Sequence, residues 1–126
     1  MLIDTDVLIW YMRGNDNARK AIEKYSPFSI SVVTYMELVQ GMRNKSELVA
    51  LRQFLKSRRV DIVYLSEEIS AKAMFYVEQF YLSHSMELAD AMIGATAVAN
   101  GDSLLTGNVK HYRSIKELQI KTFKPD

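Results

Sequence analysis

The chain has 126 residues, of which 48% are hydrophobic and 25% charged, with a formal net charge of +1 and no cysteine. This length suits a single domain with a buried core, and the composition is that of an ordinary globular protein. The lack of cysteine excludes disulfides and cysteine-ligated zinc, and fits a cytoplasmic location. No apolar run approaches the ~20 residues that span a bilayer. Two aspartates interrupt the N-terminal apolar stretch, so we expect neither a membrane segment nor a signal peptide.

Short apolar segments alternate with amphipathic ones along the chain. Leu2-Ile3 predicts a first strand, and further strands are predicted over 28–33, 61–65, 103–106 and 118–123. Helices are predicted over 5–12, from a cap at Asn15 or Asp16, over 34–43, from a cap at Ser46, from a cap at Ser66 to residue 83, and from a cap at Ser85 to residue 99. Residues 107–117 are predicted as a loop or short helix. The alternation predicts an α/β domain whose mostly parallel sheet is covered by helices on both faces.

Charge is unevenly distributed along these elements. Residues 42–59 and 108–124 are rich in lysine and arginine, whereas residues 66–90 contain five acids and one lysine. Basic segments beside an acidic one suit a polyanion held over a metal site. The same charges also suit solvent-exposed helix faces, and charge alone favours that interpretation.

Carboxylates follow or interrupt apolar segments near the predicted strand ends. Asp4 follows the first strand, and Thr106 ends the fourth. In a parallel sheet, sites lie beyond the carboxyl ends of the strands. Buried charge is costly unless it is paired or bound to metal, so Asp4 is a candidate metal ligand. Asp6 either begins the first helix or contributes an outer ligand.

Asp90 is the second candidate metal ligand. It shares an apolar helical stripe with Met86, Ile93 and Ala97, on a helix with many small side chains. A charged side chain on an inward face needs a cation or a cage of hydrogen bonds. With Ser85 as the cap, Asp90 lies too deep to cap the helix itself. A functional role is therefore favoured over stabilisation by the helix dipole.

Two interpretations of Glu37 remain open. The segment Thr34-Tyr35-Met36-Glu37 matches a capping box, in which the glutamate bonds back to the amide of the cap. Glu37 can equally face the site at the strand ends, and the residues alone slightly favour the capping box.

Several polar side chains accompany these acids. Thr5 and Thr106 offer hydroxyls near the same place, while Asn108 either orients a water or ligand or belongs to a turn. Oxygen ligands without cysteine select Mg²⁺ or Mn²⁺ over zinc. Three or four carboxylates around one or two such ions form a site for phosphodiester hydrolysis.

Four stretches resemble the PIN domain, and in particular the VapC-type toxins of bacterial toxin–antitoxin pairs. They are Asp4-Thr5-Asp6-Val7-Leu8-Ile9, Glu37-Leu38-Val39-Gln40-Gly41, Asp90-Ala91-Met92-Ile93-Gly94-Ala95-Thr96-Ala97 and Leu104-Leu105-Thr106-Gly107-Asn108. The resemblance covers essentially the whole chain and implies one PIN domain over residues 1–126. It implies a five-stranded sheet in the order 3-2-1-4-5 and a Mg²⁺-dependent endoribonuclease. It also implies a homodimer, inhibited by a VapB-type antitoxin whose tail enters the active site.

The resemblance also assigns residues by position. Asp4, Glu37 and Asp90 match the three acidic residues of the family, the expected catalytic set. Many PIN domains have a further acid after the fourth strand, where this chain has Asn108 and His111. Asp6 or Glu87 is a candidate to supply the missing charge. With Thr5, Thr106 and Asn108, these two form an expected outer set that orients ligands or substrate.

Three alternatives fit parts of the pattern. Asp4-Thr5-Asp6 is similar to the opening motif of haloacid-dehalogenase phosphohydrolases, with Asp4 as nucleophile and Asp6 as general acid/base. Leu8 departs from that family's preference, and the chain has no convincing downstream lysine and acid-pair motif. A receiver-like signalling module needs an aspartate where Leu65-Ser66 stands. A PIN fold that binds RNA without cutting it is the third alternative.

Overall fold

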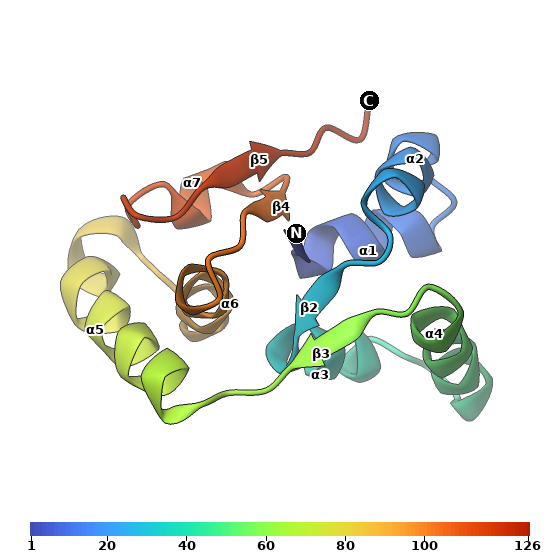
Figure 1. Cartoon of the computed structure of the whole chain (residues 1–126), viewed down its shortest axis with the longest axis horizontal. Helices are drawn as coiled ribbons and strands as arrows, with labels where there is room; N and C mark the ends of the chain where they lie inside the picture. The colour runs from blue at the N-terminus through green and yellow to red at the C-terminus, as the bar shows by residue number, and fades with distance from the viewer.

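A computed structural model describes all 126 residues of the chain, and Figure 1 shows its strands and helices. The five strands are β1 (Leu2–Ile3), β2 (Ser29–Ser31), β3 (Asp61–Val63), β4 (Leu104–Thr106) and β5 (Ile120–Thr122). The seven helices are α1 (Thr5–Met12), α2 (Asp16–Tyr25), α3 (Val32–Gln40), α4 (Lys45–Ser57), α5 (Glu67–His84), α6 (Leu88–Ala99) and α7 (Val109–Tyr112). No helix is long and apolar enough to cross a bilayer.

The strands form one parallel sheet in the order β3-β2-β1-β4-β5. This confirms the predicted α/β class and strand order. The two-residue strand β1 is central, with Leu2 beside Ser29 of β2 and Leu104 of β4. Its neighbours β2 and β4 are far apart in the sequence. The residues that follow β1 are therefore surrounded by residues distant from them in the sequence.

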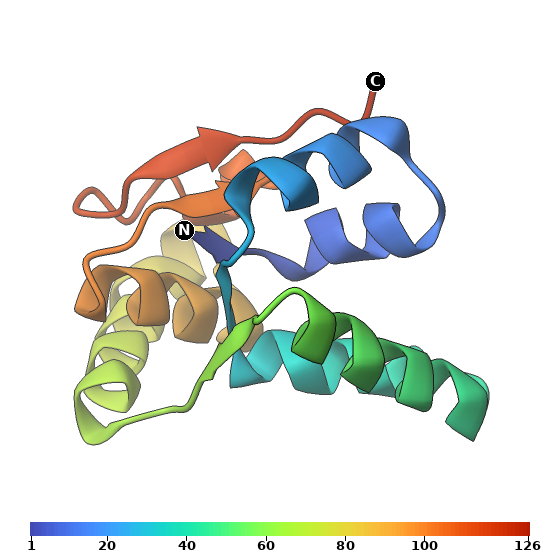
Figure 2. The ribbon, with the colours of Figure 1, turned by 45° about the vertical axis from the view of Figure 1, so that its right-hand side comes forward.

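The sheet separates two apolar cores. One core holds buried side chains of α5, α6 and the segment around α7, including Tyr76, Ile93 and Tyr112. The other holds buried side chains of α1, α2 and α4, including Leu8 and Ile22. Helix α3 contributes to both cores. Figures 1 and 2 show α5 and α6 on one side of the sheet and α1, α2 and α4 on the other.

The helix starts test the predicted caps. Asn15 and Ser66 cap α2 and α5, each side chain accepting a hydrogen bond from the amide three residues on, as predicted. Asn44, rather than Ser46, caps α4. An asparagine and a serine two residues apart satisfy the same cap preference, so the sequence did not distinguish them.

Two further helix starts differ from prediction, and both affect the site. Helix α3 begins at Val32 with Ser31 as its cap, so Thr34 lies inside the helix and the capping-box prediction for Glu37 is wrong. Ser85 ends α5 in a left-handed conformation with φ of 55°, and α6 begins only at Leu88. The predicted cap at Ser85 is therefore wrong.

Candidate active site

The candidate site lies where the carboxyl ends of β1 and β4 meet the starts of α1 and α6 and the side of α3. Asp4 is the residue between β1 and α1, and it caps α1 by accepting a hydrogen bond from the Thr5 amide at 2.8 Å. Thr106 ends β4 beside it. This is the edge of the sheet at which the sequence predicted a site.

Asp4 is a buried carboxylate, with only 3% of its surface exposed. The Thr106 hydroxyl donates to its Oδ2 at 2.7 Å, and the Tyr112 phenol lies close enough to lower the pKa of the carboxyl. Burial, with a smaller contribution from the nearby Asp6, raises the pKa of Asp4 from 3.8 to about 6, even though the hydrogen bonds oppose the rise. Asp4 is therefore an acid whose charge the fold itself does not fully compensate.

Asp6 is tied to the loop after β4. Its Oδ2 accepts a hydrogen bond from the Gly107 amide at 2.9 Å, while its Oδ1 is buried and has no hydrogen-bond partner. Burial raises the pKa of this carboxyl as well. A buried oxygen without a partner is rare and costly, and it marks a place where a ligand adds a contact that the protein lacks.

Glu37 is held by a chain of hydroxyls. The Thr5 hydroxyl donates to Glu37 Oε1 at 2.7 Å, and the Thr5 and Thr34 hydroxyl oxygens lie 2.9 Å apart. Because each hydroxyl carries one proton, Thr34 donates to Thr5 while Thr5 donates to Glu37. Glu37 therefore faces the site rather than the backbone of its own helix.

Asp90 lies in the first turn of α6, and His111 Nδ1 lies 3.5 Å from its Oδ2. Burial raises the pKa of the Asp90 carboxyl, His111 lowers it, and Glu37 and Glu87 raise it. The depth expected for Asp90 from a cap at Ser85 is wrong, because α6 starts two residues later than predicted and places Asp90 in its first turn, within reach of the helix dipole. Because Glu37 and Glu87 both raise the pKa of Asp90, the three acids lie in one region of the structure.

The other expected outer residues divide into two kinds. Thr106 links Asp4 to the following loop, because its hydroxyl also accepts from the Asn108 amide at 2.9 Å. Glu87 is exposed and precedes α6 without capping it through its side chain. The side chain of Asn108 likewise does not cap α7, so Asn108 is held through its backbone amide rather than through its side chain.

Neither Gly107 nor Tyr112 was predicted from the sequence to have a role in the site. A β-carbon on Gly107 would lie 2.7 Å from Asp6 Oδ2 and 3.3 Å from the Phe123 carbonyl oxygen. Only glycine leaves room for this approach. Tyr112 is 1% exposed. Burial raises the pKa of its phenol, and the nearby carboxylates of Asp4 and Asp90 raise that pKa further. The proximity of Gly107 to Asp6 and of Tyr112 to Asp4 has no local signal, because each pair lies about a hundred residues apart in the sequence.

The chemistry of these side chains fits a hard divalent cation. The donors are carboxylate oxygens, which Mg²⁺ and Mn²⁺ prefer. The pKa of Asp4, Asp6 and Asp90 is raised by burial in each case, and a nearby cation reverses that effect. In their present rotamers, no three Asp, Glu or His side chains already surround one ion position. The fit therefore rests on donor type, burial and the unpartnered Oδ1 of Asp6.

Comparison with known proteins identifies the family. The PIN domain model matches residues 1–117, so the chain belongs to the PIN domain family, as the sequence motifs predicted. "Ribonuclease VapC10" of Mycobacterium tuberculosis is 35% identical, over 94% of this chain and 90% of that protein. "Ribonuclease VapC1" of Methanocaldococcus jannaschii is 28% identical, over 98% of this chain and 86% of that protein.

Solved structures agree with this assignment. A chain of a toxin–antitoxin complex from Klebsiella pneumoniae superposes with a TM-score of 0.80 and 26% identity, covering 99% of this chain and 97% of that one. A chain of DNA-bound VapBC from Salmonella typhimurium superposes with a TM-score of 0.83 at 19% identity, covering 96% of each chain. The latter likeness supports the fold alone. Membership of the PIN family argues against the haloacid-dehalogenase and receiver-like alternatives.

Proposed function

We propose that this protein is an endoribonuclease that hydrolyses phosphodiester bonds of RNA and is neutralised by a VapB-type antitoxin. The observation that carries the proposal is the convergence of Asp4, Glu37 and Asp90, from three separate segments, at the carboxyl end of the central strands. The 35% identical relative called a ribonuclease, and the toxin–antitoxin complex with the same fold, support the reaction and the partner.

In this proposal, Asp4 and Asp90 hold Mg²⁺ or Mn²⁺. When bound, a divalent ion supplies stabilisation of the negative charge that develops on the phosphodiester. Asp6, whose Oδ1 has no partner in the protein, adds negative charge beside Asp4. Glu87, near Asp90, adds charge on the other side.

Glu37 is proposed to accept the proton of the attacking water. Its Oε1 is fixed by Thr5, while the side chain reaches the exposed rim of the site, so Oε2 is free to face a water. Thr5 and Thr106 keep Glu37 and Asp4 in fixed orientations, and Asn108 contacts substrate from the loop after β4. The fixed carboxylates reduce the reorganisation needed at the moment of reaction.

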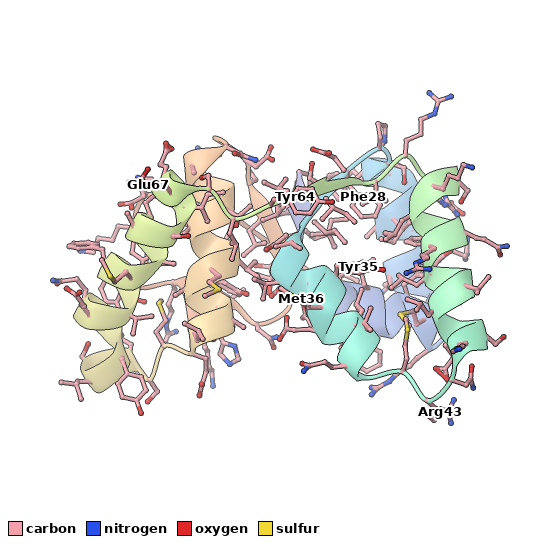
Figure 3. The ribbon with its side chains drawn as sticks, turned by 90° about the horizontal axis from the view of Figure 1, so that it is seen from below. Phe28, Tyr35, Met36, Arg43, Tyr64 and Glu67 are labelled. Atoms are coloured by element: carbon pink, nitrogen blue, oxygen red, sulfur yellow. The ribbon has the colours of Figure 1, made fainter.

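The organisation of the protein is part of the proposal. Residues 1–126 form one PIN domain, because β5 lies beyond the matched residues 1–117 and yet pairs with β4. A second copy is proposed to pack against the exposed apolar side chains Met36 of α3 and Leu88 of α6. Figure 3 shows Met36 on α3, facing the gap toward α6. We place the protein in the cytoplasm, with its RNA substrate.

The test is cleavage of RNA by protein purified free of antitoxin. We expect cutting with Mg²⁺ or Mn²⁺ that stops on chelation and is abolished in Asp4→Asn and Asp90→Asn. Asp61→Asn is the control, since Asp61 is an exposed carboxylate on β3, outside the site. Full activity in either site variant would overturn the assignment. RNA binding by the wild-type protein without any cutting would instead support a PIN-fold binding module.

A further inference from the structure

Four lysines surround one hollow between α2 and the edge strand β5. Lys20 and Lys24 come from α2, Lys121 from β5, and Lys124 from the segment after it, around a cavity of 300 Å³. The remaining lining residues are Asn17, Ala21, Tyr25, Leu105, Thr122 and Phe123. None of the ten residues is acidic. Figure 2 shows the chain beyond β5 passing beside α2 toward the C-terminus.

The helical spacing of α2 and the strand register of β5 bring these four side chains close together. Asn17, Lys20, Ala21 and Lys24 recur at helical spacing and therefore share one face of α2. Lys121 pairs in register with Leu105, so both side chains point to the face that α2 covers. The segment with Lys124 is fastened to the start of α2, because Asn17 Nδ2 donates to the Lys124 carbonyl at 3.2 Å and Asn15 Nδ2 to that of Pro125 at 2.8 Å.

The charge of the four lysines is not neutralised within the protein. None of them forms an ion pair, and the acids of α2, Asp16 and Glu23, both pair with Arg19. Lysines on an edge strand discourage edge-to-edge association, which accounts for Lys121. Lys24 in the last turn of α2 suits the helix dipole, but Lys20 four residues before it adds a slightly destabilising like charge. An anion at the hollow would reduce the repulsion among the four lysines.

One lining residue of the hollow, Phe123, links it to the acidic site through the backbone. Phe123 donates its backbone N–H to the Thr106 carbonyl at 2.8 Å, and Thr106 in turn bonds Asp4. The Phe123 carbonyl also lies against Gly107, whose amide holds Asp6. A strand of nucleic acid leaving the carboxylates over the Gly107 loop therefore reaches the lysines next.

We propose that this four-lysine hollow binds the phosphate backbone of RNA, some nucleotides away from the bond that is cut. The inference rests on the proposed ribonuclease function, and it assigns to that function a second contact region. Recognition is by backbone charge rather than by bases, because the Asn17 amide already donates to the Lys124 carbonyl and the Lys24 ammonium lies 5.3 Å from the centroid of the Tyr25 ring. The hollow thus contributes affinity and direction to substrate binding and takes no part in bond cleavage.

The test measures binding without cleavage. Wild-type protein, Lys20→Gln/Lys24→Gln and Lys121→Gln/Lys124→Gln are titrated with a single-stranded RNA in chelator over a series of salt concentrations. Loss of two phosphate contacts lowers the slope of log K against log salt by about 1.4. We also expect about tenfold weaker binding at low salt, with melting temperatures unchanged or slightly raised, since repulsion is removed. The matched control is Lys45→Gln/Lys56→Gln on α4, which removes the same charge from exposed positions outside the hollow.

The outcomes separate this inference from the proposed function. RNA binding weakened equally in the α4 control, or not weakened in the hollow variants, would overturn the inference. Neither result would count against the proposed ribonuclease function. Hollow-dependent RNA binding in a wild-type protein that never cuts RNA would keep the inference and remove the nuclease. A duplex DNA of the same length is the third arm: stronger hollow-dependent binding to DNA than to RNA would overturn RNA as the occupant.

Discussion

Thr106 donates its hydroxyl proton to Asp4 Oδ2 at 2.7 Å, joining the carboxyl ends of the adjacent strands β4 and β1 through their side chains. Both residues are buried, so the bond is not exchanged for one to water. The same hydroxyl oxygen accepts from the Asn108 amide. One hydroxyl thereby fixes a proposed metal ligand and the loop that follows β4.

Replacing Thr106 with valine removes this link while keeping the branched shape. A buried carboxylate oxygen and the Asn108 amide both lose a partner, which costs about 1–3 kcal/mol of unfolding free energy. We expect that loss in denaturant unfolding, together with weaker RNA cleavage. Thr122→Val is the control, because Thr122 pairs with Thr106 in the sheet but is exposed. Equal stability of the two variants would contradict the role given to Thr106.

The burial of Asp4 predicts a specific dependence of stability on pH. Its pKa is about 6 in the folded protein against 3.8 ordinarily, so between these values the folded state binds more protons than the unfolded state. The contribution of Asp4 to stability therefore falls as pH rises from below 4 to above 6. The full rise in pKa corresponds to roughly 3 kcal/mol.

The measurement compares wild-type protein with Asp4→Asn in metal-free buffer. We expect the variant to gain stability relative to wild type as pH rises from 4 to 7, because asparagine cannot ionise. Thermal or denaturant unfolding at several pH values provides the comparison. A difference between the two proteins that does not change with pH would show that burial does not raise this pKa.

Gly107→Ala tests the close approach of the β4–α7 loop to α1. The added β-carbon meets Asp6 Oδ2 at 2.7 Å and the Phe123 carbonyl, and the latter is backbone that cannot rotate away. We expect a loss of about 1–3 kcal/mol in unfolding free energy. Gly41→Ala is the control, since its added carbon makes only ordinary contacts of 3.6 Å or more.

A second variant identifies the cause of that loss. Asp6→Ala removes one of the two clashing groups, so Gly107→Ala should cost less in the Asp6→Ala background than in wild type. Additive effects of the two substitutions would mean that Asp6 does not set the need for glycine at position 107.

Thr5 is predicted to orient Glu37 through its hydroxyl. Thr5→Ser keeps the hydroxyl and should keep most of the RNA cleavage rate. Thr5→Val leaves the Glu37 carboxylate without its donor, and we expect kcat about 10- to 100-fold lower with little change in KM, because a positioned proton acceptor contributes roughly 10²- to 10⁴-fold and this variant removes only its orientation. Steady-state cleavage kinetics separate the two parameters. Equal rates in both variants would exclude the orienting role.

Much of the fold was predictable because the relevant signals are local. Leu2-Ile3 followed by Asp4 marked the end of a strand, and Asn15 and Ser66 marked true helix starts. The strand order came from resemblance to the PIN family. Local signals failed at Ser85, which has the residue type of a cap but adopts a left-handed conformation that ends α5. Competing caps of similar quality cannot be ranked without the tertiary packing.

The acidic residues proposed for the site could be predicted from the sequence, but the residues that hold them in place could not. An aspartate inside an apolar stripe is visible in the sequence, and Asp4 and Asp90 were found that way. The need for glycine at position 107 and the burial of Tyr112 against Asp4 depend on segments that meet only in the folded sheet. The proximity of the lysines of α2 and β5 was likewise not predicted, because no local sequence pattern in either segment indicates that the two meet in the fold.

The central place of β1 has a consequence for the order in which the protein is made. Asp4 and Asp6 leave the ribosome about a hundred residues before their partners Thr106 and Gly107. A nascent chain that stops before β4 lacks one neighbour of β1 and the loop that holds Asp6. Contacts this distant in sequence also slow folding. Synthesis therefore delays the carboxylate site until β4 and the loop that follows it have left the ribosome.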